Sequence, residues 1–499
     1  MGACDSYNNT NKNRIKISNQ INLEFILDNC FPNNKYQVQA SLLKSGNAHF
    51  SSKTVLCQQN LITLGTYTCE YFFGKTQPMK INVLKNGISL GSFETDLGEI
   101  VGSPNCILRK IVSSGGPEFI SISALGSSSS IIFDFKIKSN QFKNSDEMYF
   151  MVSTNDRKVL NESISQNGKF KPISIPTALL EPEFEVSFLN SSRENIANKK
   201  DNLASFIQQN NQEQVYLNFN HNNNSFKVYN KSQLNQQYSF IDYIKNGVQM
   251  TFSIGIDFTS QNAQESPSNP QKGAVAGSPK DIERAIRECG EIMSFYDYDQ
   301  LFHVYGFGST INNNQVKSNI FNINSETGQE IYTIDNVINE YRKRLNNISL
   351  IGPTLISPII KNEIDMIRKE NNLLIYHVLM ILTYGEISDL DQIISTINTA
   401  SSLPLSLIII GIGNYDYKDI ISSLRNNNSE RKFIQIVKFN DCRNTGGLSG
   451  QALDKIPNQI IEYYLSLNID SNTLKAGNIQ NLTIKNYNNY NNQRNQPLY

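Results

Sequence analysis

The sequence lacks several features that would indicate common functions. Lysine plus arginine (45) balance aspartate plus glutamate (45), and no RNA-binding or zinc-finger signature is present, so we expect no nucleic-acid partner. The seven cysteines lie far apart and form no C-x-x-C pair, which excludes the usual zinc and redox motifs and is typical of reduced thiols. No run approaches the roughly 18 to 20 apolar residues of a membrane span, and the N-terminus lacks the apolar core of a secretory signal. We therefore expect an intracellular protein.

Enzyme motifs are also missing. There is no G-x-x-x-x-G-K-[ST] loop, and Gly411-Ile412-Gly413 lacks the third glycine of a dinucleotide site. Of the four histidines, His303 and His377 fall at the starts of predicted buried strands, and none belongs to a known catalytic pattern. We expect a binding protein with no small-molecule substrate, not an enzyme.

The N-terminus, residues 1–14, carries a candidate lipidation signal. Gly2 and Ser6 fit the M-G-x-x-x-[ST] pattern for myristoylation, and Cys4 lies beside them for palmitoylation. One myristoyl chain gives only marginal membrane binding, whereas a second acyl chain makes attachment stable. We predict an acylated, flexible N-terminus; the alternative is an unmodified, disordered tail.

Residues 15–246 have the pattern of antiparallel β-structure. Short alternating or apolar runs are separated by Gly, Asn and Ser turns, at the spacing of a sandwich. The segment 126–130, Gly-Ser-Ser-Ser-Ser, is a candidate linker. We predict one all-β sandwich over 15–126 and a second over 131–246; the alternative is one large irregular β domain. The predicted strands are 21–27, 36–43, 79–84, 119–125, 131–137, 148–153, 184–189 and 215–219.

Residues 247–470 alternate between apolar strands and amphipathic helices. This alternation predicts an α/β domain with a doubly wound, largely parallel sheet. The Asn-rich residues 471–499 are expected to be a disordered tail. The predicted strands are 250–256, 303–307, 375–382, 405–410 and 434–439, and the predicted helices are 281–296, 335–345, 391–402 and 451–467.

One strand of this domain ends on residues suited to a cation. Asp257 and Thr259 follow the apolar run Met250–Ile256 directly. A carboxylate and a hydroxyl at the carboxyl end of a buried strand are oxygen ligands that a divalent cation prefers, at the edge of the sheet where ligands collect. The pair is therefore a candidate metal site.

A series of ordered motifs resembles the copine family. The segment Tyr238–Thr259 resembles the junction into the von Willebrand factor A-like domain of copines, and further matches extend to about Ile469. The β-rich half resembles the two C2 domains that copines carry, mainly in position and architecture. The resemblance implies calcium-dependent phospholipid binding and an A-like domain that binds partner proteins. The further matching segments are 296–299, 306–308, 341–342, 352–354, 357–360 and 400–413.

The resemblance also implies a metal site in the A-like domain, and the sequence departs from its pattern. Asp257, Thr259 and Thr354 match, but Gln261 stands where the family has a serine and Tyr384 replaces the aspartate of the third loop. Because Mg²⁺ is usually bound through one or two carboxylates, we expect Mg²⁺ binding to be weak or absent. The alternatives are that Glu386 substitutes for the missing carboxylate, or that Asp257 is only a polar cap at a strand end.

The calcium-binding loops of C2 domains normally carry several aspartates, because Ca²⁺ takes six to eight oxygen ligands. In the first sandwich the segments 31–35 and 84–87 carry none, and in the second only Asp146 is a weak candidate ligand. We therefore expect Ca²⁺ sites to be weak or absent in both sandwiches. Direct contact with lipid headgroups is still expected from four basic residues, Lys35, Lys85, Lys143 and Arg193.

These features together predict a lipid-anchored, copine-like peripheral membrane protein. We expect a phospholipid membrane as one partner and a protein bound by the A-like domain as the other, in signalling or membrane trafficking. The expected location is the cytosolic face of the plasma membrane or of endomembranes. The alternative is a soluble scaffold that binds neither lipid nor metal.

Overall fold

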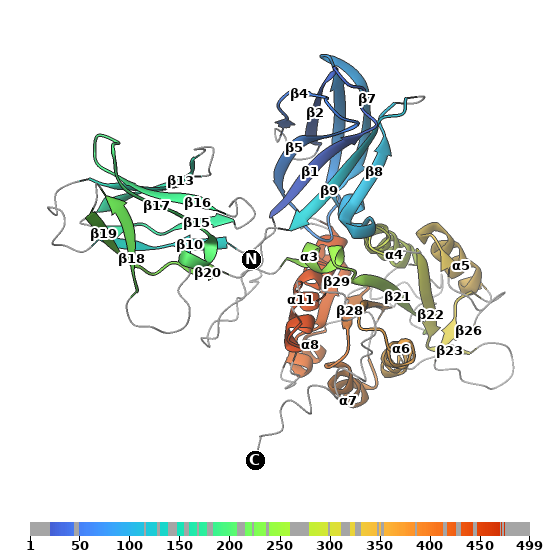
Figure 1. Ribbon diagram of the computed structural model, residues 1–499. Coiled ribbons are helices and arrows are strands. Elements are labelled where there is room, and N and C mark those ends of the chain that lie inside the picture. Colours follow the sequence, from blue (N-terminus) through green and yellow to red (C-terminus); the bar gives the residue numbers. More distant parts are fainter. Residues whose placement is uncertain are drawn as a thin grey trace. The chain divides into compact units, whose positions relative to one another are not determined.

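The computed structural model confirms the predicted fold class: two sheet-rich sandwiches are followed by an α/β domain (Figure 1). Among the described residues no helix is both long and apolar enough to span a bilayer. The structure describes residues 20–43, 49–113, 116–126, 130–137, 147–153, 159–166, 169–176, 183–206, 215–221, 224–235, 239–259, 279–297, 300–310, 320–324, 331–346, 349–350, 354–384, 387–412, 417–425, 431–442, 447–469, 471 and 474.

The first sandwich contains two antiparallel sheets, ordered β5-β1-β9-β8 and β3-β2-β6-β7. Every second side chain of β1 is buried, which is the pattern of a strand with one face on the core. Four long strands, β1, β2, β6 and β9, lie where the sequence predicts them. The elements are β1 (Gln20–Asp28), β2 (Lys35–Leu42), β3 (His49–Ser51), β4 (Val55–Leu56), β5 (Leu61–Glu70), β6 (Pro78–Lys85), β7 (Ile88–Asp96), α1 (Leu97–Gly102), η1 (Pro104–Cys106), β8 (Ile107–Ile111) and β9 (Phe119–Gly126).

In the second sandwich eight strands, β11-β14-β13-β12-β16-β17-β18-β19, form a closed ladder beside the sheet β15-β10-β20. The predicted strand 131–137 is two strands, because Asp134 leaves the ladder and its backbone bonds Lys231 and the Ser232 hydroxyl. The core is rich in phenylalanine. The elements are β10 (Ser130–Phe133), β11 (Phe135–Ile137), β12 (Tyr149–Ser153), β13 (Val159–Gln166), β14 (Lys169–Phe170), β15 (Ile173–Pro176), β16 (Phe184–Leu189), β17 (Asn195–Asp201), α2 (Leu203–Phe206), β18 (Val215–His221), β19 (Asn224–Asn230) and β20 (Gln233–Asn235).

The α/β domain is built on a sheet ordered β24-β22-β21-β27-β28-β29, in which β22, β21, β27, β28 and β29 are parallel. The chain passes from β21 to β22 on one side and later returns to β27 on the other. The carboxyl ends of β21 and β27 therefore form the topological switch point of the sheet. The strands are β21 (Gln249–Asp257), β22 (Leu301–Phe307), β23 (Ser309–Thr310), β24 (Phe321–Asn322), β25 (Ile331–Tyr332), β26 (Ser349–Leu350), β27 (Ile375–Thr383), β28 (Leu405–Gly411) and β29 (Ile434–Lys438).

The helices of this domain differ from the sequence prediction at several places. The predicted helix 451–467 is two helices, because Pro457 lacks an N–H and begins a new helix after Lys455. The sequence reasoning also missed α3, α6, α8 and α9, of which α6 starts at Ser357-Pro358. The helices are α3 (Phe240–Lys245), α4 (Pro279–Met293), α5 (Ile334–Asn346), α6 (Ser357–Glu370), α7 (Leu390–Ala400), α8 (Lys418–Arg425), α9 (Phe439–Cys442), α10 (Leu448–Ala452) and α11 (Ile456–Ser466).

The first sandwich and the α/β domain form one compact unit, 19–126 with 240–499, and the second sandwich, 127–239, belongs to another. The aromatic ring of Phe73 packs on Phe240 and Tyr296, and the hydroxyls of Tyr71 and Tyr296 share a buried hydrogen bond. A side chain at Gly102 would collide with the Phe295 carbonyl. The units divide between residues 239 and 240, so α3 belongs to the unit that contains the α/β domain.

Candidate functional site

Asp257 lies at the switch point of the α/β sheet, as the last residue of β21. Thr259 follows it, Thr383 ends the neighbouring strand β27, and Thr354 approaches from the segment before α6. All four side chains are buried. The structure therefore brings together the three predicted residues, Asp257, Thr259 and Thr354, and adds Thr383 to them.

The carboxylate of Asp257 accepts several hydrogen bonds from the protein itself. Its Oδ1 accepts the Thr259 N–H at 2.9 Å. Its Oδ2 accepts the Thr383 hydroxyl at 2.8 Å, the Tyr384 N–H at 3.2 Å and the Thr354 hydroxyl at 3.5 Å. Asp257 thus joins three loops, and its lone pairs are directed at protein donors.

Burial raises the pKa of the Asp257 carboxyl, and the bonds from Thr259, Thr383 and Tyr384 oppose that rise. A buried carboxylate that keeps its charge needs such donors, because desolvation favours the neutral acid. All of these donors are neutral hydroxyl or N–H groups. The dipoles of these groups therefore stabilise the negative charge.

Tyr384 takes part through its backbone rather than its ring. Its N–H contacts Asp257, while its hydroxyl is buried together with that of Tyr341. Burial raises the pKa of both phenols. The site thus holds one carboxylate and three threonine hydroxyls. Gln261 and Glu386 lie outside the described residues.

A residue that the sequence reasoning missed holds the Thr354 loop in place. The carboxylate of Asp389 accepts the N–H groups of Ile356 at 3.1 Å and Ser357 at 2.8 Å, at the start of α6. Ser388 donates its N–H to the Thr354 carbonyl at 3.0 Å. An acidic side chain at a helix N-terminus is favoured by the free N–H groups there. In the sequence, Asp389 resembles only a cap for the helix that follows it.

The donor set fits a divalent cation poorly. Mg²⁺ is usually bound by one or two carboxylates together with water or phosphate oxygens, and here the single carboxylate is already hydrogen-bonded. Among the described residues no three His, Cys, Asp or Glu side chains gather as metal ligands. Binding of a cation would have to displace the hydroxyl and N–H donors from Asp257.

A second candidate site lies at one end of the first sandwich. Four loops lie side by side there, because the strands that flank them are paired. The pairs next to the loops are Asp28 with Leu61, Lys35 with Leu56, Lys85 with Ile88, and Ile111 with Phe119. In Figure 1 this end lies away from α3 and α4. Its exposed large side chains, which we call the apolar tip, are Phe31, Leu56, Leu61, Ile88 and Ile111.

Tight turns built by asparagine and glycine present this tip. The two-residue turn Asn86-Gly87 has φ values of 52° and 83°, which suit Asn and Gly in a hairpin turn. It places Ile88, 75% exposed, directly after the turn. The sequence analysis considered these loops only because they lack carboxylates, and it missed their exposed apolar residues. An isoleucine directly after an Asn-Gly turn is the signal that could have revealed these apolar residues.

The remaining predicted residues are divided between described and undescribed parts of the chain. Lys35 is exposed beside the apolar tip. Arg193 is paired with Glu162 through bonds of 2.6 and 3.2 Å and lies over the Tyr149 ring, so its charge is already neutralised. Four candidates lie outside the described residues: Gly2, Cys4, Lys143 and Asp146.

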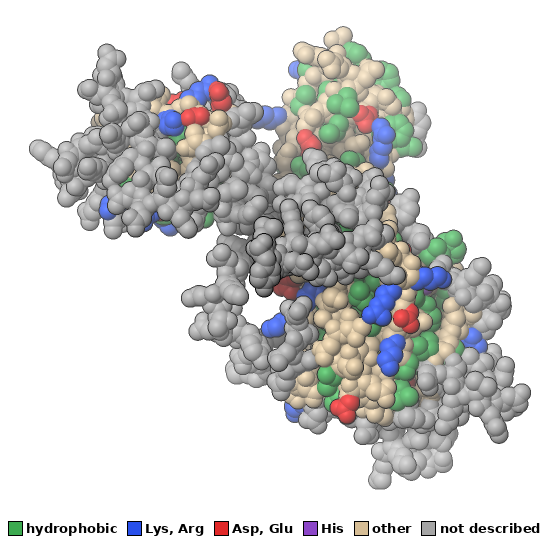
Figure 2. Space-filling view, turned by 60° about the horizontal axis from the view of Figure 1, so that its bottom comes forward, with side chains coloured by type: hydrophobic (Ala, Val, Ile, Leu, Met, Phe, Trp, Pro, Cys, Tyr) green, Lys and Arg blue, Asp and Glu red, His purple; other side chains and the backbone are tan. Residues whose placement is uncertain are grey.

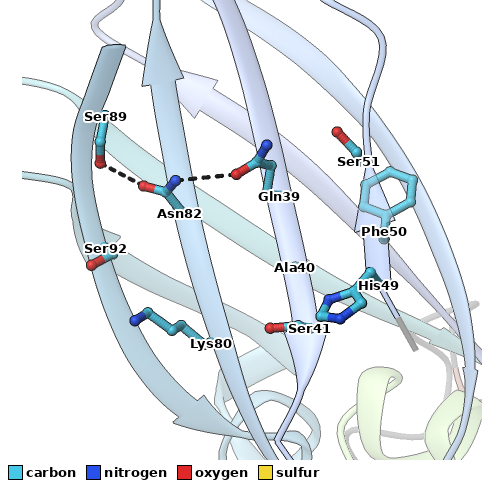
Figure 3. Close-up of a pocket in the computed structure, with 10 residues that line it drawn as sticks. All are labelled: Gln39, Ala40, Ser41, His49, Phe50, Ser51, Lys80, Asn82, Ser89 and Ser92. Atoms are coloured by element: carbon cyan, nitrogen blue, oxygen red, sulfur yellow. Dashed lines mark hydrogen bonds between the residues drawn. The ribbon is translucent and has the colours of Figure 1, made fainter. Parts of the chain in front are cut away.

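A polar hollow of about 510 Å³ lies on the face of the sheet β3-β2-β6-β7 (Figure 3). Asn82 bridges Ser89 and Gln39 across the strands, by bonds of 2.6 and 3.2 Å. Lys80 and His49 contribute a cationic and a titratable group at its margin. The hollow is lined mainly by hydroxyl and amide groups, as is usual for the solvent-exposed face of a sheet. On the surface in Figure 2, basic and acidic side chains are interspersed rather than gathered into one field.

His377 lies between two carboxylates near the amino end of β27. Its ring nitrogens bond Glu363 at 2.8 Å and Glu370 at 3.0 Å, both on α6. Burial lowers the pKa of His377, but the two carboxylates outweigh burial and raise it to about 9. His377 is therefore an imidazolium that compensates the buried Glu363.

Comparison with known proteins agrees with this architecture. The family model named Copine matches residues 275–472. The chain carries a copine domain. The family resemblance predicted from the sequence is thereby confirmed. The Nicotinic receptor-associated protein 1 of Caenorhabditis elegans is 31% identical over 264 residues, 48% of this chain; the chain spans 41% of that relative's length.

Two solved structures are similar to parts of this chain at low identity. The paired C2 domains of Extended-Synaptotagmin 2 cover 48% of this chain and 99% of their own, at 12% identity and a TM-score of 0.27. The manganese-loaded TRAP protein of Plasmodium vivax covers 39% of this chain and 70% of its own, at 11% identity and a TM-score of 0.28. At these scores neither neighbour informs on the activity of this copine-domain chain.

Proposed function

We propose that the chain is a peripheral membrane protein that docks on phospholipid bilayers through the apolar tip of its first sandwich. The observation that carries the proposal is the convergence of five exposed large apolar side chains on four loops at one end. Such a protruding set suits a deformable lipid surface better than the pocket of a rigid protein. Inserting a half-exposed side chain of this size contributes about 1 kcal/mol.

The charge beside the tip favours an anionic bilayer. Lys35 is exposed there, and no ion pair of its side chain is found within the described part of the chain. A basic residue close to an anionic membrane surface contributes about 1 kcal/mol. The acyl chains predicted at Gly2 and Cys4 would add the stable anchor, so the proposed location is the cytosolic face of a cellular membrane.

The proposed partner surface for a second protein is the α/β domain, through the carboxyl edge of its sheet. Support comes from the copine family, in which we expect the A-like domain to bind proteins, and from the position of Asp257 at the switch point. We propose binding rather than catalysis, because the Asp257 carboxylate at this edge is hydrogen-bonded by donors of the chain itself. A role in signalling or trafficking fits such an adaptor.

The membrane proposal is tested by sedimentation of the full-length, unacylated protein with vesicles of phosphatidylcholine, with and without phosphatidylserine. The variant Phe31→Ser/Ile88→Ser should bind roughly 30-fold more weakly, since two side chains contribute about 2 kcal/mol. The matched control is Leu43→Ser/Ile107→Ser, exposed apolar residues outside the tip. Equal binding by both double variants, or no binding by the wild type, would contradict the proposal.

The anchor is tested separately in cells. The Gly2→Ala protein should move into the soluble fraction, whereas chelation of calcium should leave the wild type on membranes. A wild-type protein that is unmodified at Gly2 and stays soluble would favour the scaffold function instead.

A further inference from the structure

The loops of the apolar tip are held together by amide hydrogen bonds. The Asn86 side chain donates to Asn34 Oδ1 at 2.8 Å and accepts the Lys35 N–H at 2.8 Å. The Asn86 N–H donates to the Lys35 carbonyl at 2.7 Å. These bonds connect the β1–β2 loop to the β6–β7 turn with neutral groups alone.

Two carboxylates lie at the same end, and each has a basic partner. Glu118 is buried and its Oε1 lies 3.0 Å from the Lys85 ammonium. Asp28 accepts a bond of 3.0 Å from Arg109 and a weaker one of 3.4 Å from the Ser121 hydroxyl. Neither carboxylate is left for an added cation.

The Lys85 ammonium lies among three loops. It lies over the Phe31 ring, 4.3 Å from its centroid, and over the Tyr36 ring at 5.7 Å. The Tyr36 hydroxyl accepts the Phe31 N–H at 3.1 Å. A cation over an aromatic face is attracted by the ring quadrupole, so the ammonium holds Phe31 of the tip as well as Glu118.

Calcium-binding C2 domains place a cation among their loops, and the residues here do not fit one. Ca²⁺ needs six to eight oxygen ligands, with carboxylates supplying the charge. The loops described at this end, which omit only residues 114 and 115, provide amides and two carboxylates, Glu118 and Asp28, that are already paired with Lys85 and Arg109. The Lys85 ammonium would repel a calcium ion and already neutralises Glu118.

We propose that the Lys85 ammonium is a built-in substitute for calcium, which orders the apolar tip so that it docks on phospholipid bilayers without responding to calcium. This inference rests on the membrane function proposed above. It assigns Lys85 an internal role in place of the lipid contact predicted from the sequence, and leaves that contact to Lys35.

The test is vesicle sedimentation of the full-length, unacylated protein in calcium or in chelator. The wild type should bind equally in both. Lys85→Met should bind about tenfold more weakly, because Glu118 is left unpaired and Phe31 loses its cation. Lys85→Met/Glu118→Gln, which removes both charges, should recover to within about threefold of the wild type.

The matched control is Lys35→Met, which removes an exposed lysine of the same tip. Its loss of binding should appear only on vesicles that contain phosphatidylserine, whereas that of Lys85→Met should appear on both kinds. Wild-type binding that requires calcium, or Lys85→Met binding like the wild type, would overturn the inference and leave the membrane function standing. A wild type that binds no vesicles would overturn the membrane function itself. If Lys85→Met does not fold, the calcium response of the wild type and the binding of the double variant still test the role of Lys85.

Discussion

The tip of the first sandwich and the carboxyl edge of the α/β sheet both stabilise a buried carboxylate, but with different chemical groups. Each holds a buried carboxylate, Glu118 at the tip and Asp257 at the edge of the sheet. Glu118 is neutralised by the Lys85 ammonium at 3.0 Å. Asp257 is held by neutral hydroxyl and N–H donors.

The difference shows how a loop region can be ordered without a bound metal. An ammonium supplies a full charge, whereas hydrogen-bond donors spread the carboxylate charge over several dipoles. His377, which compensates Glu363, shows that the α/β domain also uses an internal cation at its other edge. We therefore expect Asp257 to retain a weak affinity for cations that Glu118 lacks.

Removal of the Asp257 carboxylate should have the largest effect on the free energy of unfolding. Asp257→Ala leaves the Thr259 and Tyr384 N–H groups and the Thr383 hydroxyl buried without this acceptor, at a cost of about 1 to 3 kcal/mol each. We expect the free energy of unfolding, measured with urea, to fall by about 3 to 5 kcal/mol. The control is Asp335→Ala, an exposed carboxylate paired with Arg287, for which less than about 1 kcal/mol is expected. Equal losses would refute the role of Asp257 as a hub.

The imidazolium of His377 should make the free energy of unfolding depend on pH. His377→Leu leaves Glu363 buried without its partner and should cost about 3 kcal/mol near pH 6.5. Because the pKa of His377 is raised from 6.5 to about 9 in the folded state, its stabilisation is complete below pH 6.5 and is lost as pH rises through about 9. Urea unfolding at several pH values should show this decline in the wild type and its absence in His377→Leu. A second substitution, Glu363→Gln, should recover much of the loss.

The ammonium at the tip should matter less to stability, because the Lys85 side chain is 26% exposed. Lys85→Met should lower the free energy of unfolding by about 2 kcal/mol after allowance for solvent screening. In a double-mutant cycle with Glu118→Gln the two losses should not add, since both remove the same pair. Additive losses would show that the two groups act independently.

Added cations should have the smallest effect on stability, and that effect should differ between the Asp257 site and the apolar tip. Mg²⁺ at a concentration equal to its dissociation constant stabilises a protein by only about 0.4 kcal/mol. We expect a thermal shift of that order from millimolar Mg²⁺, absent in Asp257→Asn, and none from Ca²⁺. A Ca²⁺ shift that survives in Asp257→Asn but disappears in Glu118→Gln would place a metal at the tip and reverse the comparison.

The sequence by itself determined the sheet-and-helix pattern of this chain. Nearly continuous apolar runs such as Ile375–Leu382 predict buried parallel strands, because both faces of each strand are covered. The order of motifs around Asp257, Thr259 and Thr354 indicated the copine domain. Spacing along the chain carried this information, since strands and helices depend mainly on neighbouring residues.

Only the tertiary structure decided which groups neutralise one another. Lys85 and Glu118 are 33 positions apart, and Thr383 meets Asp257 across 126. Likewise Phe73 packs against Tyr296 although a complete sandwich lies between them in the sequence. No local pattern records such pairings, because strand order and chain crossovers bring these residues together. The sequence thus indicated Asp257 as a candidate cation ligand, and the fold shows that Asp257 is hydrogen-bonded by the chain's own donors and that Glu118 is paired with the Lys85 ammonium.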